Sequence, residues 1–332
     1  MNQFLNASIE GVRRLLFLIP KHPEIAQIEI TNRCNFNCLM CQRIDLKVPI
    51  SDMDYNVYLK VMKKLDGIKE IILTGWGEPL MHPKLIEIID VAKKNKKRVS
   101  LTSNGSLLTE KTAKKLLDSK IDSISFSLDD VNAPKTGSIG HPVTIQLKNI
   151  ENFMKLIKGK KTRPQVVIQV TLHKNKEKQI FEVIKWAGRI EADLVNINRL
   201  DMRFNNKLSR PDYFEEKELV QKLERVSKEC KIRVEFRSHV AFSGKLRQIY
   251  KILIPFLQRG GKHCLRVYNY IYINQRGEVT PCCALPLLSF GNLIGQNLDN
   301  IWKGQAFNNF RKHKFQRKIC GKCDVLEIKQ YC

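Results

Sequence analysis

The chain has 332 residues, 43% hydrophobic and 27% charged, a composition typical of a soluble protein with a substantial core. No apolar run approaches the roughly 20 residues that a bilayer span needs, so the sequence excludes a transmembrane helix. Lysine and arginine outnumber aspartate and glutamate by 58 to 33, and the resulting formal net charge of +25 favours anionic partners.

The first 24 residues form a lead-in segment without the small-residue cleavage site of a signal peptide, which predicts a cytoplasmic protein. Residues 9–19 within this segment have the pattern of an amphipathic helix. We expect this helix to pack over the domain that follows rather than to lie on a membrane surface.

Strand and helix patterns alternate from residue 25 to residue 201. Six strands are predicted, at residues 25–31, 70–74, 98–102, 123–128, 165–171 and 193–198. Near-continuous apolar strands separated by helices are typical of a parallel sheet that helices cover. Six units are too few to close an eight-stranded barrel, so the sequence predicts an α/β core domain with an open, partial (β/α)6 TIM-type barrel.

Residues 202–260 are predicted to bridge this core domain to a small C-terminal domain. They contain a polar loop, one helix, a short strand at 232–236 and an apolar helix near 249–257. Two consecutive glycines mark the boundary with residues 261–332, which carry six of the ten cysteines. Ten cysteines in a chain without a signal peptide indicate metal ligation rather than disulfides.

The sequence TNRCNFNCLMC, residues 31–41, directly follows the first predicted strand. Its three thiolates, in a C-x3-C-x2-C array, can converge on one centre, and soft sulfur ligands select iron–sulfur clusters, zinc or copper(I). A structural zinc site needs a fourth protein ligand that no nearby residue supplies, whereas a four-iron cluster with three protein ligands leaves one iron open. In barrel enzymes, the catalytic residues lie on the loops that follow the carboxyl ends of the strands, as this loop does. The three thiolates belong to Cys34, Cys38 and Cys41.

Glycine and polar residues follow the next three predicted strands. The second strand ends in TGWGEP, residues 74–79, whose glycines allow a ligand to approach the backbone closely. The third strand ends in TSNG and the fourth in SFSLD, and their hydroxyl and amide groups are suited either to ligand binding or to ordinary turns and caps.

The C-terminal cysteines form a second candidate metal site. Residues 270–280 are predicted to form a hairpin, which brings Cys264 and Cys282 towards each other. Cys320 and Cys323, spaced C-x2-C, supply two more thiolates. These four thiolates are compatible with an iron–sulfur cluster or with a zinc ribbon. Cys283 is either a spare residue or a thiol that faces substrate.

The cysteine loop and the TGWGEP turn resemble the radical S-adenosylmethionine (SAM) superfamily. The resemblance implies that the three cysteines hold a [4Fe–4S] cluster whose open iron is chelated by SAM. Reductive cleavage of SAM then yields a 5′-deoxyadenosyl radical that abstracts a substrate hydrogen. The resemblance further assigns SAM binding to Gly75, Gly77, Glu78, Asn104 and Ser127. Met40 departs from the family pattern, in which this position is often aromatic.

The C-terminal pattern, C-x12-G-x4-C followed by Gly291-Asn292-Leu293 and then C-x2-C, resembles a SPASM or twitch domain. The resemblance implies one auxiliary [4Fe–4S] cluster held by Cys264, Cys282, Cys320 and Cys323. A full SPASM pattern with two clusters requires a cysteine where this chain has Lys329, so the single-cluster twitch arrangement is predicted.

Three functions remain open at this point. The first is an oxidoreductase or epimerase that acts on a small anionic or carbohydrate-like molecule and receives electrons from a flavodoxin or ferredoxin. The alternative is a peptide-modifying maturase of the SPASM type. One feature argues against it: the 24-residue lead-in is too short for a separate leader-peptide recognition domain. The third, a metal-binding nucleic-acid protein without enzymatic activity, is disfavoured by the TGWGEP turn and by lysines that are not interleaved with aromatic residues. No nucleic-acid partner is therefore expected.

Overall fold

The computed structural model describes residues 22–43, 45–132, 143–203, 208–236, 264–313 and 316–323. Within these residues, ten strands form one sheet in the order β10-β9-β8-β1-β2-β3-β4-β5-β6-β7. The strands are β1 (Ile25–Ile28), β2 (Glu70–Leu73), β3 (Arg98–Ser103), β4 (Ser123–Ser127), β5 (Gln165–Leu172), β6 (Leu194–Arg199), β7 (Val234–Phe236), β8 (Tyr270–Ile273), β9 (Glu278–Thr280) and β10 (Gly291–Asn292). All six predicted strands are present, although β1 ends earlier than predicted, at Ile28.

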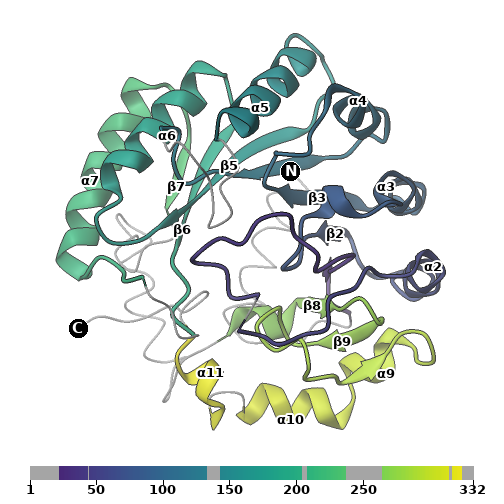
Figure 1. Cartoon of the computed structure of the whole chain (residues 1–332). Coiled ribbons are helices and arrows are strands. Elements are labelled where there is room, and N and C mark those ends of the chain that lie inside the picture. Colours follow the sequence, from purple (N-terminus) through teal and green to yellow (C-terminus); the bar gives the residue numbers. More distant parts are fainter. Residues whose placement is uncertain are drawn as a thin grey trace, which may run out of the picture.

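The strands from β1 to β7 are parallel, and each pairs with the next along the chain. The helices between them are α2 (Tyr55–Met62), α3 (Leu85–Lys94), α4 (Glu110–Asp118), α5 (Val143–Ile157), α6 (Glu177–Arg189) and α7 (Tyr213–Glu229). Figure 1 shows these helices along the outer, convex side of the curved sheet. The described strands do not close into a ring, which confirms the predicted partial barrel.

Alternating side chains give the sheet one apolar and one polar face. In β5, Ile168 and Val170 are buried in the hydrophobic core, whereas Gln169 between them is only partly buried. In β6, Ile197 is buried in the same core and Asn196 before it is only partly buried. Successive side chains of a strand point to opposite faces, so the amides lie on the concave face, away from the helices.

Two helices begin at side-chain caps that hold their first turns. Thr109 accepts a hydrogen bond from the Thr112 N–H (3.2 Å) at the start of α4. Asp212 and Glu215 form a reciprocal capping box at the start of α7. Such caps satisfy backbone donors that the helix itself leaves unpaired, and they fix where the chain turns back towards the sheet.

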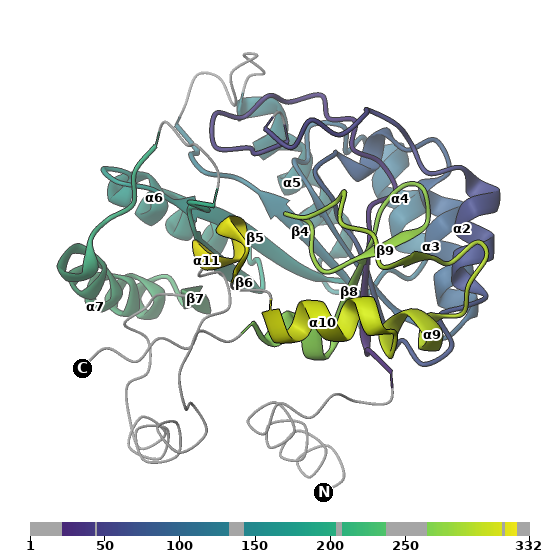
Figure 2. The same ribbon diagram turned by 90° about the horizontal axis from the view of Figure 1, so that it is seen from below.

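The C-terminal hairpin extends the same sheet beyond β1. β8 pairs in parallel with β1, from Tyr270 beside Ile25 to Ile273 beside Ile28. It then pairs antiparallel with β9, so the predicted hairpin is present. The helices that follow are α9 (Leu298–Trp302), α10 (Gln305–His313) and α11 (Lys318–Gly321). Figures 1 and 2 both place α11 near the end of β6.

In the ranges given above, no helix combines the length and hydrophobicity that crossing a bilayer requires. The predicted amphipathic helix at residues 9–19 and the predicted apolar helix near 249–257 lie outside the described residues. Lys329, on which the predicted count of auxiliary clusters depends, also lies outside them, as does the tenth cysteine, Cys332.

Candidate functional site

The predicted cysteine loop leaves the carboxyl end of β1 and crosses the concave side of the sheet. Figure 1 shows it as the purple segment in the middle of the view, and Figure 2 shows it over one end of the strands. The base of the loop is anchored by Asp52, which accepts hydrogen bonds from the Thr31 hydroxyl (2.6 Å) and from Arg33 Nε and Nη2 (2.9 and 2.6 Å). Because these contacts precede the first cysteine, they hold the loop in place independently of any bound metal.

The three thiols of the loop lie close enough to influence one another. Burial, together with the nearby Cys41 and Asp129, raises the pKa of Cys38 to about 12. Burial also raises the pKa values of Cys34 and Cys41, whereas Arg43 opposes the rise at both. Cysteine binds metal as the thiolate, so cluster binding at this loop releases protons.

In the described part of the chain, no three His, Cys, Asp or Glu side chains form a group that could hold a single metal ion. The assignment of individual cysteines to clusters stays a prediction that depends on spacing, on the loop position and on the family.

The TGWGEP turn packs directly against the backbone that leads into the cysteine loop. A Cβ atom on Gly77 would lie 2.4 Å from the Thr31 carbonyl oxygen and 2.6 Å from that of Arg33. A Cβ atom on Gly75 would lie 2.3 Å from Cγ of Glu29. Both glycines are thus required by close packing within the protein, in addition to the SAM contacts predicted for them.

Glu78 and Asn104, both predicted SAM ligands, are neighbours. The buried carboxylate of Glu78 accepts hydrogen bonds from the Leu80 N–H (3.0 Å), the Ser103 hydroxyl (2.8 Å) and the Asn104 N–H (2.6 Å). Burial raises the pKa of Glu78, and these three hydrogen bonds oppose the rise. The structure therefore gives Glu78 the role of joining the ends of β2 and β3.

Asn104 in turn contacts the cysteine loop. Its Nδ2 donates to Oδ1 of Asn35 (2.9 Å), and its Oδ1 accepts from the N–H and hydroxyl of Ser106 (2.9 and 2.7 Å). Ser127, at the end of β4, is instead exposed on the concave side. Glu78 and Asn104 are thus part of one network, whereas Ser127 is available to a ligand.

Two buried carboxylates at this site were not singled out from the sequence. Glu29 follows β1 and accepts hydrogen bonds from the Trp76 N–H and from Gln275 Nε2, both at 2.7 Å. Burial raises its pKa above the ordinary value of 4.5. Burial also raises the pKa of Asp129, beside Cys38, to about 6. Glu29 could have been singled out from the sequence, because it is a charged residue inside the largely apolar strand predicted at residues 25–31.

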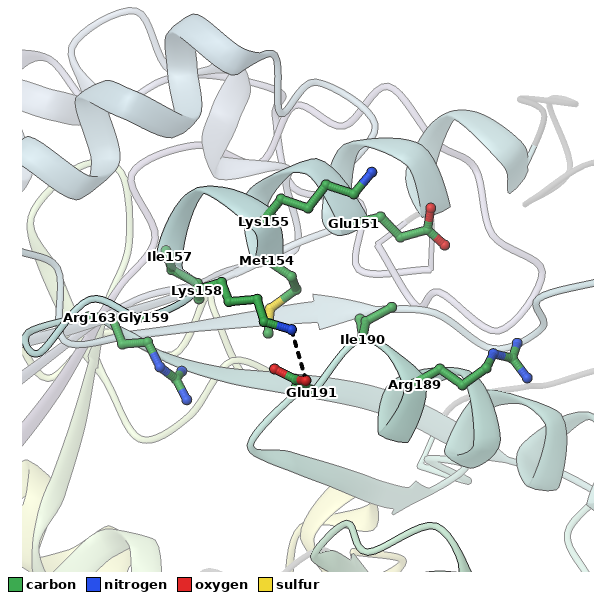
Figure 3. Close-up of a pocket in the computed structure, with 10 residues that line it drawn as sticks. All are labelled: Glu151, Met154, Lys155, Ile157, Lys158, Gly159, Arg163, Arg189, Ile190 and Glu191. Carbon is green, nitrogen blue, oxygen red and sulfur yellow. Dashed lines mark hydrogen bonds and ion pairs between the residues drawn. The ribbon is translucent and has the colours of Figure 1, made fainter.

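A cavity of about 210 Å³ opens between the cysteine loop and the TGWGEP turn. Its lining combines apolar side chains with the cations of Arg43 and Lys47 and the carboxylate of Glu29. The complete lining is Glu29, Asn32, Arg43, Leu46, Lys47, Val48, Ile50 and Trp76. A second cavity of about 400 Å³, between α5 and α6, is drawn in Figure 3. It lies at the amino ends of β5 and β6, opposite the cysteine loop, and does not belong to this site.

The C-terminal cysteines gather near the end of β6. Cys320 has Cys264 and Cys323 among its electrostatic neighbours, and burial raises its pKa to about 11. Cys282 adjoins Cys283, and burial raises its pKa to about 12. Arg203, which follows β6, is an electrostatic neighbour of Cys282 and Cys283 and also of Cys320 and Cys323. The structure thus brings the four predicted auxiliary ligands into one region.

The two cysteine sets are connected through the TGWGEP turn. The indole Nε1 of Trp76 donates a hydrogen bond to the carbonyl oxygen of Cys283 (2.9 Å). Trp76 also donates its backbone N–H to Glu29, which holds Gln275 of the hairpin turn. The predicted SAM-binding turn therefore contacts the C-terminal segment directly.

Two family models match the chain. The radical SAM superfamily model matches residues 28–187, and the SPASM model, an iron–sulfur cluster-binding domain, matches residues 264–324. The chain is a radical SAM protein with a SPASM domain. It therefore uses SAM and a [4Fe–4S] cluster, and its SPASM domain implies auxiliary iron–sulfur clusters.

Curated relatives of this radical SAM protein differ in function. The tungsten-containing aldehyde ferredoxin oxidoreductase cofactor-modifying protein of Pyrococcus furiosus is 29% identical over 181 residues, which cover 52% of this chain and only 50% of that relative. The AdoMet-dependent heme synthase of Methanosarcina barkeri is 27% identical over 328 residues, 93% of this chain and 90% of the relative. The PqqA peptide cyclase of Gluconobacter oxydans is 23% identical over 324 residues, 93% of this chain and 85% of the relative.

Among solved structures, Streptococcus suis SuiB superposes with a TM-score of 0.69 at 15% identity, over 93% of this chain and 72% of SuiB. This likeness shows that the two proteins share the fold across both matched domains. The predicted radical SAM core and the predicted C-terminal iron–sulfur domain are both confirmed as families.

Proposed function

We propose that this radical SAM protein modifies a C–H position of a peptide substrate. Of the sequence-based expectations, this was the alternative to a small anionic or carbohydrate-like substrate. The PqqA peptide cyclase, a relative named for a peptide substrate, aligns with 93% of this chain and so includes both matched domains. The likeness in sequence therefore extends to the SPASM region as well as to the core.

A row of hydrogen-bonding side chains on the concave face carries the proposal. Ser127 of β4 is in register with Gln169 of β5, which is in register with Asn196 of β6. Asn196 is in register with Glu235 of the edge strand β7. The Oδ1 atom of Asn196 is buried and has no hydrogen-bond partner among the described residues. A buried acceptor without a partner is costly, so it is suited to a donor that a ligand brings.

The chemistry of this row fits a peptide better than a highly charged small molecule. Its carboxamides offer both donors and acceptors, which is what the N–H and C=O groups of a peptide backbone require. The row starts at Ser127, the predicted SAM contact, and runs to the sheet edge at β7. A peptide bound along it has one residue next to SAM and the rest directed out of the barrel.

Each group of residues then has its own role. Cys34, Cys38 and Cys41 hold the cluster that, with SAM, supplies the hydrogen-abstracting radical. Gln169 and Asn196 bind and orient the peptide so that one C–H bond faces that position. The C-terminal cysteines hold the auxiliary cluster beside the same concave face.

A second candidate is a small carboxylated molecule such as a tetrapyrrole. The heme synthase is similar over 93% of this chain and 90% of its own length. The cations Arg43 and Lys47 in the 210 Å³ cavity are suited to carboxylates on such a molecule.

The test is release of 5′-deoxyadenosine by the anaerobically reconstituted protein with SAM and a chemical reductant. One arm adds a defined mixture of unstructured synthetic peptides, and the other adds a tetracarboxylate tetrapyrrole. We expect the peptides to increase release and to lose two hydrogens or gain a cross-link, as read by mass spectrometry. Stimulation by the tetrapyrrole alone contradicts the peptide proposal.

Variants of the polar row sharpen this test. Gln169→Ala and Asn196→Ala are expected to raise the peptide concentration needed for half-maximal stimulation while leaving iron content unchanged. Gln165→Ala is the matched control, because Gln165 lies on the same face of β5 but at its amino end, away from the cysteine loop. An equal effect of all three changes contradicts a binding role for the row.

A further inference from the structure

Two buried guanidinium groups lie among the C-terminal cysteines. Arg266 follows Cys264 by two residues, and its guanidinium carbon lies 4.8 Å from the ring centroid of Tyr270. Burial alone would lower the pKa of Arg266, but Tyr270 and the nearby Cys283 and Cys282 outweigh burial and raise it. No salt bridge joins Arg266 to a carboxylate within the described residues. Its charge is therefore directed at the cysteines and at one aromatic ring.

Arg203 provides the second cation. Its side chain is 8% exposed, and its Nε donates to both carboxylate oxygens of Asp201 (2.9 and 2.8 Å). Burial would lower the pKa of Arg203, but Asp201, Cys283 and Cys323 raise it. The positive charge of Arg203 in turn lowers the pKa values of Cys282 and Cys320.

The Asp201–Arg203 pair is held in place from the other cysteine set. The backbone oxygen of Asp201 accepts a hydrogen bond from Nε2 of Gln42 (2.9 Å). Gln42 is 2% exposed and directly follows Cys41. The position of the Arg203 charge is therefore fixed relative to the cysteine loop.

Among the residues that the structure describes, the charges near the C-terminal cysteines do not cancel. Asp201 offsets the charge of Arg203, whereas no described carboxylate forms a salt bridge with Arg266. A thiolate-bound iron–sulfur cluster is anionic and gains a further negative charge on reduction. Its potential depends on net charge, hydrogen bonds and exposure, and buried charges act strongly because the surrounding dielectric is low. A fixed cation beside such a cluster stabilises the reduced state more than the oxidised state.

We propose that Arg203 and Arg266 raise the reduction potential of the auxiliary cluster, so that this cluster serves as the electron acceptor of the reaction. The step moves one electron from the substrate radical to the oxidised cluster, and the substrate releases a proton to solvent. Together with the hydrogen atom already abstracted, the substrate then has lost two hydrogens. The inference rests on the proposed placement of the auxiliary cluster at the C-terminal cysteines, and it holds whether the substrate is a peptide or a small molecule.

The experiment is a redox titration followed by electron paramagnetic resonance in the full chain. Cys34, Cys38 and Cys41 are first changed to Ala, so that only the auxiliary cluster gives a signal. At the midpoint of this parent protein, Arg266→Gln is expected to lower the ratio of reduced to oxidised cluster at least tenfold. For a one-electron couple this is a shift of about 59 mV to more negative potential. Arg203→Gln is expected to shift the midpoint in the same direction.

The matched control is Arg276→Gln in the β8–β9 turn. Arg276 carries the same charge but pairs with Glu278 (2.7 Å) at the surface. Its loss is expected to leave the midpoint within experimental error. A shift as large as that of Arg266→Gln shows that overall charge rather than the local guanidinium is responsible, and overturns the proposal.

Two further variants separate charge from packing. Arg266→Lys keeps the charge and is expected to restore most of the parent potential. Asp201→Asn removes the carboxylate that offsets Arg203 and is expected to shift the midpoint to more positive potential, opposite to Arg203→Gln. A Lys variant as low as the Gln variant, or an Asp201→Asn shift to more negative potential, overturns the proposal.

Iron analysis distinguishes this failure from failure of the cluster placement. A parent protein without iron contradicts the placement of the auxiliary cluster itself. Variants with full iron and an unchanged midpoint contradict only the electrostatic role of the two arginines.

Discussion

The two cysteine sets of this protein use the same ligand atom in different electrostatic surroundings. Near the loop after β1, the carboxylates of Glu78 and Asp129 raise the pKa values of Cys34 and Cys38, and one guanidinium, that of Arg43, lowers those of Cys34 and Cys41. Near the C-terminal set lie two guanidinium groups, of which that of Arg203 pairs with the carboxylate of Asp201. Negative neighbours oppose the addition of an electron to a cluster and positive neighbours favour it. We therefore expect the first set to donate an electron and the second set to accept one.

The sharpest way to break this comparison is to remove one set. Changing Cys34, Cys38 and Cys41 together to Ala is expected to reduce iron from about eight to about four atoms per chain, since each cubane holds four. All cleavage of SAM should stop, because the cluster with the open iron that SAM chelates is lost. Iron analysis and 5′-deoxyadenosine release check this.

Cys230→Ala is the control, because Cys230 caps the end of α7 rather than belonging to either set. Iron and cleavage should stay normal in it. Cleavage that survives the triple change contradicts the assignment of the loop.

Gly77→Val tests how closely the first set depends on its packing. A Cβ atom at Gly77 would meet the Thr31 carbonyl oxygen at 2.4 Å, so the loop backbone must shift. We expect both the affinity for SAM and the iron content of the loop to fall. If Gly77 only contacted SAM, as the resemblance implies, the change would weaken SAM binding and leave the iron content normal.

Gly295→Ala serves as the control, because nothing lies within 4 Å of a Cβ atom there. Equilibrium binding of SAM and iron analysis distinguish the two glycines. A Gly77→Val protein with normal iron and weak SAM binding supports the direct cofactor contact instead.

The smallest expected effect concerns Glu29, which joins the TGWGEP turn to the C-terminal hairpin. Burial raises its pKa in the folded protein, so between its unfolded and folded pKa values the folded state binds more protons. Stability contributed by this group is therefore full below about pH 4.5 and is lost as the pH rises through the folded pKa. Glu29→Gln is expected to remove this part of the pH dependence.

Denaturant unfolding of the metal-free protein at several pH values measures it. A difference between wild type and variant that does not change with pH contradicts a titrating Glu29. Glu87→Gln is a suitable control, since the Glu87 side chain is 45% exposed and its pKa is lowered by a backbone hydrogen bond at the helix start and by Lys84, so the pH dependence that it removes has the opposite sign.

The fold was predictable because its signals are local and repeated. An apolar run such as that around Ile168 predicts a strand, and a cap such as Thr109 predicts a helix start, from only a few neighbouring residues. Six successive strand–helix units repeated these signals. The pairing of β8 with β1 was not predictable, because it joins residues that lie about 245 positions apart through ordinary backbone hydrogen bonds.

The site was predictable to the extent that its residues lie in short motifs. The cysteine loop and the TGWGEP turn have characteristic spacing, so their chemistry could be inferred. Arg203 and Arg266 could not be singled out, since an arginine in a basic chain has no distinctive local pattern. Their importance arises from burial and from neighbours that only the fold brings together.

The most direct test of the contrast between the two cysteine sets is a redox titration of both clusters in the wild-type protein. The triple cysteine variant identifies which spectroscopic signal belongs to the auxiliary cluster. The auxiliary cluster is expected to be reduced at a more positive potential than the cluster of the loop after β1. Equal potentials, or an auxiliary cluster that is reduced at a more negative potential, would contradict the division into donor and acceptor.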